Sequence, residues 1–223
     1  MERASRRQRY VWPMVLCLAF AGCGATRSSA DNPTSVGGLT PSVRDAEAGL
    51  VAIAPGFDIA KYTIIVVEKF PVTDPDVRDE GDRRFAAKMN HVLHLELLRR
   101  LRESGLFQQV IDASETELTP TDAPALRLRG AITRLGRGSQ AARAFAGLYG
   151  AGRTRAQADM QFIEVASGRA VLLTADRRVA SYSPWTFGGS DEENLEESFD
   201  DMARDLARFL VRLSKGEAPK APR

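Results

Sequence analysis

Histidine and cysteine are both scarce in this sequence, with two residues of each among 223. Two histidines leave little material for a metal centre or for the base of a catalytic triad, and no G-x-S-x-G elbow is present. Two cysteines cannot build a disulfide framework, although a chain of this length can bury a core without cross-links. The sequence carries no catalytic signature, so we expect a protein that is not an enzyme and has no cofactor.

Long apolar runs and an excess of one charge are also missing. The longest apolar run, residues 10–21, is twelve residues long and is too short to cross a membrane as a standard helix. The formal net charge is +2, and the first 22 residues contribute +3 to it, so a chain beginning at Cys23 would carry about −1. This balance gives no reason to expect nucleic acid as a partner.

The first 22 residues have the organisation of a bacterial export signal, with a basic stretch, an apolar stretch and then small residues. Two processing sites compete at its end. Ala19-Phe20-Ala21 fits an ordinary signal peptidase, which would cut before Gly22. The next cysteine, Cys23, ends a sequence that resembles a lipobox, in which the cysteine receives a diacylglyceryl group, although Phe20 stands where leucine is preferred.

Cysteine usage favours lipidation. Cys17 is removed by either cleavage, and ordinary cleavage would leave Cys23 as a lone free thiol in an oxidising compartment. We therefore predict a signal peptide over residues 1–22 and lipid attachment at Cys23, which makes the membrane a partner. Gly24 follows the cysteine in place of aspartate, which by the enterobacterial sorting rule predicts the outer membrane, with the protein facing the periplasm.

Composition divides the mature chain into three parts. Residues 23–57 are rich in small and polar residues without periodicity, so we predict a lipid-anchored flexible linker. Residues 58–214 form the predicted globular domain, and residues 215–223 a disordered tail.

Hydrophobic periodicity predicts seven elements within the domain. The β-branched run 62–67 indicates a buried strand, and residues 82–104 a long helix with Gly105 as its cap. Strands follow at 106–111, 125–135, 155–164 and 169–181, and a last helix starts at Ser190 and ends near 214. The order β-α-β-β-β-β-α predicts an α+β fold: a mixed, largely antiparallel sheet of about five strands with two long helices on one face.

Three clusters admit a ligand but are better explained structurally. His91 and His94 lie three apart on the predicted helix without the flanking glutamate of a zinc protease, so we expect an ordinary helix surface or boundary. The acidic residues 74–82 lack the ligand order of an EF-hand and suit the start of a helix. The glycines of residues 147–152 lead into a strand, whereas a phosphate loop leads into a helix. We therefore predict no metal site.

Aromatic residues in two connecting segments are candidates for contact with a protein partner. Trp185 and Phe187 lie in a predicted loop, and Tyr149 lies in the glycine-rich segment. Trp185 could equally fold back onto the core as a lid, and the sequence leaves both possibilities open.

Four stretches resemble a bacterial lipoprotein family catalogued as a domain of unknown function (DUF4410-like). They are YTIIVVEKF, the pattern Leu-x-x-Ser-Gly-Leu-Phe-x-x-Val at residues 101–110, LRLRGAITRLGRG and FIEVASGRAVL. The chain is also distantly similar to small α/β domains of envelope lipoproteins. By analogy, this resemblance implies a non-catalytic domain that binds an envelope protein. It does not indicate an oligomeric state.

The first hypothesis is therefore a non-catalytic, lipid-anchored envelope lipoprotein whose periplasmic domain binds a protein partner. Two alternatives remain open. One is a soluble periplasmic ligand-binding or enzymatic domain released by cleavage after Ala21. The other is an accessory subunit of an export or transport machine.

Mass spectrometry of the mature protein distinguishes cleavage before a lipidated Cys23 from ordinary cleavage after Ala21. We expect an N-terminal Cys23 that carries acyl mass, and a fatty-acid probe that labels the wild type but not a Cys23→Ala variant. A Cys17→Ala variant is the matched control and should be labelled like the wild type. An unmodified N-terminus at Gly22 would contradict lipidation.

Overall fold

The computed structural model describes residues 26–28, 30–115, 123–136, 154–179 and 191–222. Their elements are β1 Thr26–Ser28, β2 Val43–Asp45, β3 Gly49–Ile53, the 3-10 helix η1 Ile59–Lys61, β4 Ile64–Val67, α1 Glu80–Glu103, β5 Gln109–Asp112, β6 Ala125–Gly136, β7 Arg155–Glu164, β8 Ala170–Val179 and α3 Asp191–Ser214.

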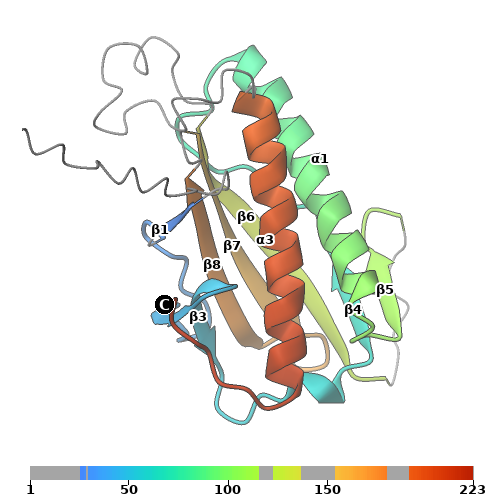
Figure 1. Ribbon diagram of the computed structural model, residues 1–223. Coiled ribbons are helices and arrows are strands. Elements are labelled where there is room, and N and C mark those ends of the chain that lie inside the picture. The colour runs from blue at the N-terminus through green and yellow to red at the C-terminus, as the bar shows by residue number, and fades with distance from the viewer. Residues whose placement is uncertain (1–25, 29, 116–122, 137–153, 180–190, 223) are drawn as a thin grey trace, which may run out of the picture.

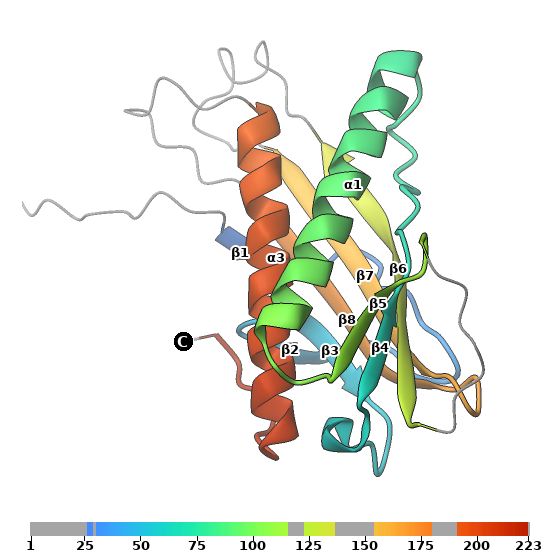
Figure 2. The same ribbon diagram turned by 90° about the vertical axis from the view of Figure 1, so that its right-hand side faces the viewer.

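The strands form one eight-stranded sheet in the order β2-β3-β8-β7-β6-β4-β5, and β1 pairs with β8. Strand β4 runs parallel to both β5 and β6, and the other pairings are antiparallel. Helices α1 and α3 lie side by side across one face (Figures 1 and 2). The predicted α+β class, the largely antiparallel sheet and the helix layer are confirmed, but the sheet has eight strands where about five were expected.

The core lies between the sheet and the two helices. Every second residue of β7 from Ala156 to Phe162 faces this core and is buried, as the predicted alternation requires. From the other side, α3 contributes Phe199 and Phe209, each fully buried. Helix α1 begins after Asp79, whose carboxylate accepts the backbone N–H of Asp82, and it stops before Gly105, whose φ of +64° ends the helical path.

The prediction of a flexible linker over residues 23–57 is wrong for the part that the structure describes. Strands β2 and β3 form a hairpin, and β3 pairs with β8. Gly49 permits this pairing, because its φ is +75° and a Cβ there would lie 2.3 Å from the carbonyl oxygen of Ala175. Short strands in a polar, glycine-containing sequence carry too little periodicity to be recognised without the sheet edge that they join.

The residues before this hairpin are also held to the sheet. Residues 26–36, which we call the N-terminal strap, start with β1 and continue across the sheet face that is turned away from the helices (Figure 2). There the backbone N–H of Asp31 bonds to Gln157, and that of Thr34 bonds to Asp159. Both acceptors are on β7, at positions that alternate with its core residues.

The prediction of a disordered tail over residues 215–223 is likewise wrong for residues 215–222. The backbone N–H of Lys220 donates to Oδ2 of Asp45 at 2.8 Å, and its carbonyl accepts from Ala46 at 2.7 Å. Arg212, near the end of α3, reaches both carboxylate oxygens of Asp45 at 2.9 and 2.8 Å. The Asp45 side chain is fully buried, so this one carboxylate joins the N-terminal hairpin to α3 and the tail.

We expect an Asp45→Asn variant to lose about 3 kcal/mol of the free energy of unfolding, because the neutral amide would break the two-oxygen pairing with Arg212 and put a donor where a fully buried carboxylate oxygen now accepts. Asp76→Asn is the matched control. Its carboxylate is 75% exposed in an ion pair with Arg78, so it should cost less than about 1 kcal/mol. Chemical denaturation measures both, and equal losses would contradict the role of Asp45.

The difference in the free energy of unfolding between wild type and Asp45→Asn should depend on pH. Burial acts to raise the pKa of Asp45, but the bond from Arg212 and three backbone N–H groups outweigh it and lower that pKa. Because the pKa of Asp45 is lowered in the folded state, its ionised carboxylate contributes to the free energy of unfolding at pH values above its ordinary pKa of 3.8. This contribution is lost as the pH falls through the folded-state pKa. The difference between wild type and Asp45→Asn should therefore shrink in acid below pH 4.

Candidate functional site

A groove beside the helix pair is a concave site within the described part of the chain. It lies between the C-terminal halves of α1 and α3 and has a volume of about 460 Å³. That volume is within the range of small ligand sites and suits a short peptide segment. Its lining residues are Glu47, Arg100, Glu103, Ser104, Arg204, Ala207, Arg208, Val211 and Arg212.

The spacing of three arginines on α3 produces one wall of this groove. Arg204, Arg208 and Arg212 recur every four residues, so they lie on the same side of the helix about 6 Å apart along its axis. Ala207 and Val211 supply apolar surface between them. This side of the groove therefore combines guanidinium groups with the apolar surface of Ala207 and Val211. Such a surface suits a ligand that carries carboxylates on an apolar body.

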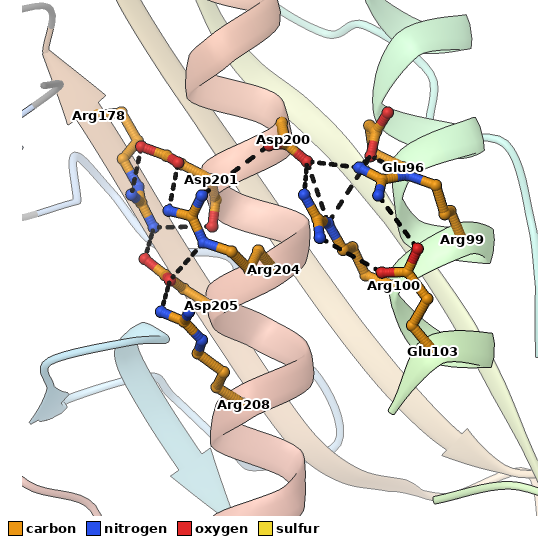
Figure 3. Close-up of polar contacts among 10 residues, drawn as sticks. All are labelled: Glu96, Arg99, Arg100, Glu103, Arg178, Asp200, Asp201, Arg204, Asp205 and Arg208. Atoms are coloured by element: carbon orange, nitrogen blue, oxygen red, sulfur yellow. Dashed lines mark hydrogen bonds and ion pairs between the residues drawn. The ribbon is translucent and has the colours of Figure 1, made fainter. Parts of the chain in front are cut away.

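A network of ion pairs connects this wall to the sheet and to α1 (Figure 3). Arg178 of β8 donates to Asp176 and to Asp205, at 2.9 Å each. Arg204 pairs with Asp201 and, more loosely, with Asp200 at 3.9 Å. The network thus runs from β8 to the exposed side of α3.

Asp200 carries the network onward to α1. Its Oδ1 accepts from Arg100 at 2.6 Å and from Arg99 at 3.0 Å, and both arginines also pair with Glu103 of their own helix. Burial acts to raise the pKa of Asp200, but hydrogen bonding to Arg100 and the charges of both arginines lower it overall. The carboxylate is therefore ionised at neutral pH and fixes α3 against α1.

The buried end of the network is Arg178, whose side chain is only 5% exposed. Burial acts to lower its pKa, and the neighbouring carboxylates of Asp176 and Asp205 outweigh this and raise it. A buried guanidinium needs such partners, because an unpaired charge beneath α3 would cost several kcal/mol. Arg178 is thus a structural part of the network, beneath the groove.

Arg208 differs from the other arginines of the groove. Its side chain is 61% exposed, and within the described residues its one ion pair joins Nη1 to Oδ1 of Asp205 at 3.5 Å. Asp205 already accepts from Arg178, so this contact is weak. A guanidinium has five N–H donors in a planar fork. Arg208 can therefore donate to a carboxylate from outside the chain without breaking a strong internal contact.

The two histidines do not share a surface, and His94 is more deeply buried than the expected helix surface or boundary position. His91 is exposed, whereas His94 is buried, with Nε2 3.0 Å from Oδ1 of Asp112 on β5. The ring and carboxylate are close but not aligned as a linear hydrogen bond. Burial acts to raise the pKa of Asp112, but the hydroxyl and backbone N–H of Ser114, together with His94, lower it to about 2. The contact fixes α1 against β5.

The acidic stretch 74–82 acts at the start of α1, as predicted. Asp79 caps the helix, and Asp74 is buried and accepts the backbone N–H groups of Asp76 and Leu135. Across the described ranges, no group of three or more histidine, cysteine, aspartate or glutamate side chains is arranged to hold a metal ion.

Several predicted site residues lie outside the described residues. These are Cys23, Tyr149, Trp185 and Phe187, together with the glycines of residues 147–152. The structure nevertheless brings the described chain close to Cys23, because Thr26 is already paired with Val179 at the end of β8.

Sequence reasoning missed the groove. The signal for its wall was the four-residue spacing of Arg204, Arg208 and Arg212, which is equally typical of a solvated helix face. Its other wall comes from α1 and from Glu47, about a hundred or more residues away along the chain. Only the packing of α1 against α3 brings these residues together.

The architecture defines a class: an α+β domain with two long helices over one face of a mixed sheet and a charged groove beside them. The family model described as "Domain of unknown function (DUF4410)" matches residues 65–184, more than half of the chain. The protein belongs to this family, and the resemblance noted in the sequence is confirmed. No curated protein matches the sequence.

Three solved structures are similar in fold. The PelC dodecamer from Paraburkholderia phytofirmans is 14% identical, with 70% of this chain and 94% of that chain covered and a TM-score of 0.42. XCC0632 from Xanthomonas campestris, of family DUF330, is 12% identical, with 79% and 95% covered and a TM-score of 0.46. A candidate lipoprotein from Caulobacter crescentus is 12% identical, with 73% and 96% covered and a TM-score of 0.36. These similarities are too low to indicate a shared function.

The helices of the described residues were also considered as membrane spans. None combines the length and the apolar character that crossing a bilayer requires.

Proposed function

We propose that this protein is a non-catalytic lipoprotein of the cell envelope, anchored through Cys23 in the outer membrane and facing the periplasm. Its domain binds a protein partner through the groove between α1 and α3. The observation that carries the binding proposal is Arg208, an exposed guanidinium with spare donors in a groove that has an apolar floor.

The chemistry of the groove favours an acidic segment of the partner. The residues that line the groove include four arginines and two glutamates, and Arg208 is the arginine whose charge the neighbouring carboxylates engage least. In an extended peptide, alternate side chains lie about 6.6 Å apart, close to the rise of about 6 Å between Arg204 and Arg208. Two carboxylates on alternate residues would therefore match two arginines one helical turn apart.

The anchor part of the proposal is supported by the sequence around Cys23. Each methylene of an acyl chain buried in a bilayer contributes about 0.8 kcal/mol, so several chains on one cysteine hold the protein stably at a membrane. The described chain begins only three residues after Cys23, at Thr26, so the anchor would be joined closely to the domain.

Photo-crosslinking in cells that produce the full chain tests the groove. A photoreactive residue in place of Val211 should give an adduct with an envelope protein that carries an acidic segment. Arg208→Glu should reduce this adduct at least about tenfold, because charge repulsion replaces a charge-assisted bond. The same group in place of Leu95, which is 47% exposed on α1, controls for non-specific capture.

Arg84→Glu is the matched control for the change of charge. Arg84 is exposed near the start of α1 and pairs only with Glu80 among the described residues. It should leave the adduct unchanged. An adduct that survives Arg208→Glu, or one that Arg84→Glu reduces equally, would contradict binding in the groove.

A further inference from the structure

The N-terminal strap is bound to the sheet from its first described residue. Thr26, Arg27 and Ser28 pair antiparallel with Val179, Arg178 and Arg177 of β8. Three backbone pairs alone would make a marginal contact. The strap therefore depends on further contacts along residues 30–36.

The first of these contacts is a two-point clamp on Gln157. The backbone N–H of Asp31 donates to Oε1 of Gln157, and the carbonyl of Asp31 accepts from Nε2, each at 2.9 Å. The Asp31 carboxylate also pairs with Arg177 of β8 at 2.5 Å. Gln157 is fully buried, and the strap supplies the hydrogen-bond donor to its Oε1.

The second contact is on Asp159, two residues further along β7. Its Oδ2 accepts both the backbone N–H and the hydroxyl of Thr34, at 2.8 and 2.6 Å. Its Oδ1 accepts from Nε2 of Gln157 at 3.0 Å. Asp159 is 3% exposed, and these donors give both of its side-chain oxygens a hydrogen-bond partner. The strap thus supplies hydrogen-bond partners to two buried polar side chains of β7, Gln157 and Asp159.

Chain length then limits the position of Cys23. Only residues 24 and 25 separate it from Thr26. Three Cα–Cα steps span at most about 11 Å. Cys23 therefore lies within about 11 Å of the paired Thr26, and a lipid on it cannot be far from the sheet.

The direction of β1 decides which end of the domain is near the lipid. Because β1 is antiparallel to β8, its first residue lies beside Val179, the last residue of β8. Strand β6 ends and β7 begins at this same end, since Gly136 pairs with Arg155. Both helices also begin here, where Lys88 of α1 pairs with Glu192 of α3 (Figure 1).

We propose that the N-terminal strap is a rigid mount that holds this end of the domain against a lipid surface. The end that bears the last residue of β8 and the first turns of α1 and α3 faces the membrane. The opposite end, with the β7–β8 turn and the last turn of α3, points away from it. The mount rests on the proposed lipidation of Cys23 and adds a fixed orientation to it.

The orientation has a consequence for the groove. Arg208 lies 17 residues after the start of α3, which corresponds to about 26 Å along the helix. In a domain held in this orientation, the groove lies about 26 Å from the membrane-facing end of α3. A partner in the aqueous compartment can reach it there.

Energy transfer from a single tryptophan to dansyl headgroups tests the mount. The processed protein carries one tryptophan, Trp185, because Trp12 leaves with the signal peptide. In a Trp185→Phe background, Arg155→Trp places the donor at the proposed membrane end and Lys215→Trp at the opposite end. Both side chains are exposed. The lipoprotein is reconstituted in phosphatidylethanolamine and phosphatidylglycerol vesicles that contain dansyl lipid.

We expect the transfer rate at position 155 to exceed that at position 215 by roughly threefold or more, because the two ends of α3 alone lie about 36 Å apart. Equal transfer, or more from position 215, would overturn the mount. A second pair, Arg84→Trp and Arg169→Trp, repeats the test at other exposed positions in case one variant fails to fold.

A ten-residue Gly/Ser insertion after Gly24 is the matched control. The inserted segment has a root-mean-square end-to-end distance of about 18 Å and leaves the domain unchanged. It should therefore reduce the difference in energy-transfer rate between positions 155 and 215. A difference that persists unchanged would mean that the domain binds lipid by itself, and would overturn the mount.

Flotation of the protein with the vesicles distinguishes failure of the anchor from failure of the mount. If the protein from cells does not float, lipidation of Cys23 is wrong. The mount is then measured on the mature chain from Cys23 onward, after its thiol has been coupled to a maleimide lipid. The same threefold contrast would support the rigid mount, and its absence would overturn it.

Discussion

The edge of β8 that does not face β7 is the constraint on which the rest of the structure depends, because the N-terminal strands must pair with it. One side of β8 is occupied by β7 along its whole length, and the other side is divided between β3 and β1. This shared edge draws the chain from residue 26 to residue 53 into the sheet. Asp45 then joins the same N-terminal hairpin to Arg212 and Lys220. A segment with the composition of a linker is thereby part of the domain.

Charge organises the helix layer in a comparable way. Arg178 beneath α3 and Asp200 between the helices fix the layer, and their partners neutralise most of the arginines around them. Arg208 is the arginine of the groove that this network engages least. The proposed binding site therefore arises from the same ion pairs that position α3. These pairs neutralise most of the arginines and leave the guanidinium of Arg208 available for a ligand.

Sequence patterns predicted the elements that have their own periodicity. Strand β7 begins and ends at the predicted residues 155 and 164, and α1 is capped by Asp79 and Gly105 with its boundaries shifted by one or two residues. The strap could not be predicted, because its residues are polar and its stability comes from Gln157 and Asp159, more than a hundred positions away. The groove escaped detection for the same reason, since it depends on how two helices pack and not on the pattern of either.

The central claim is that residues 26–53 belong to the folded domain. Hydrogen exchange of the backbone amides tests it most directly. The account predicts that amides of β1 and β3, and that of Thr34, exchange slowly and within a factor of about ten of the paired amides of β7, since they join one cooperative sheet. Exchange of residues 26–53 at the rate of an unstructured chain, with β7 still protected, would contradict it.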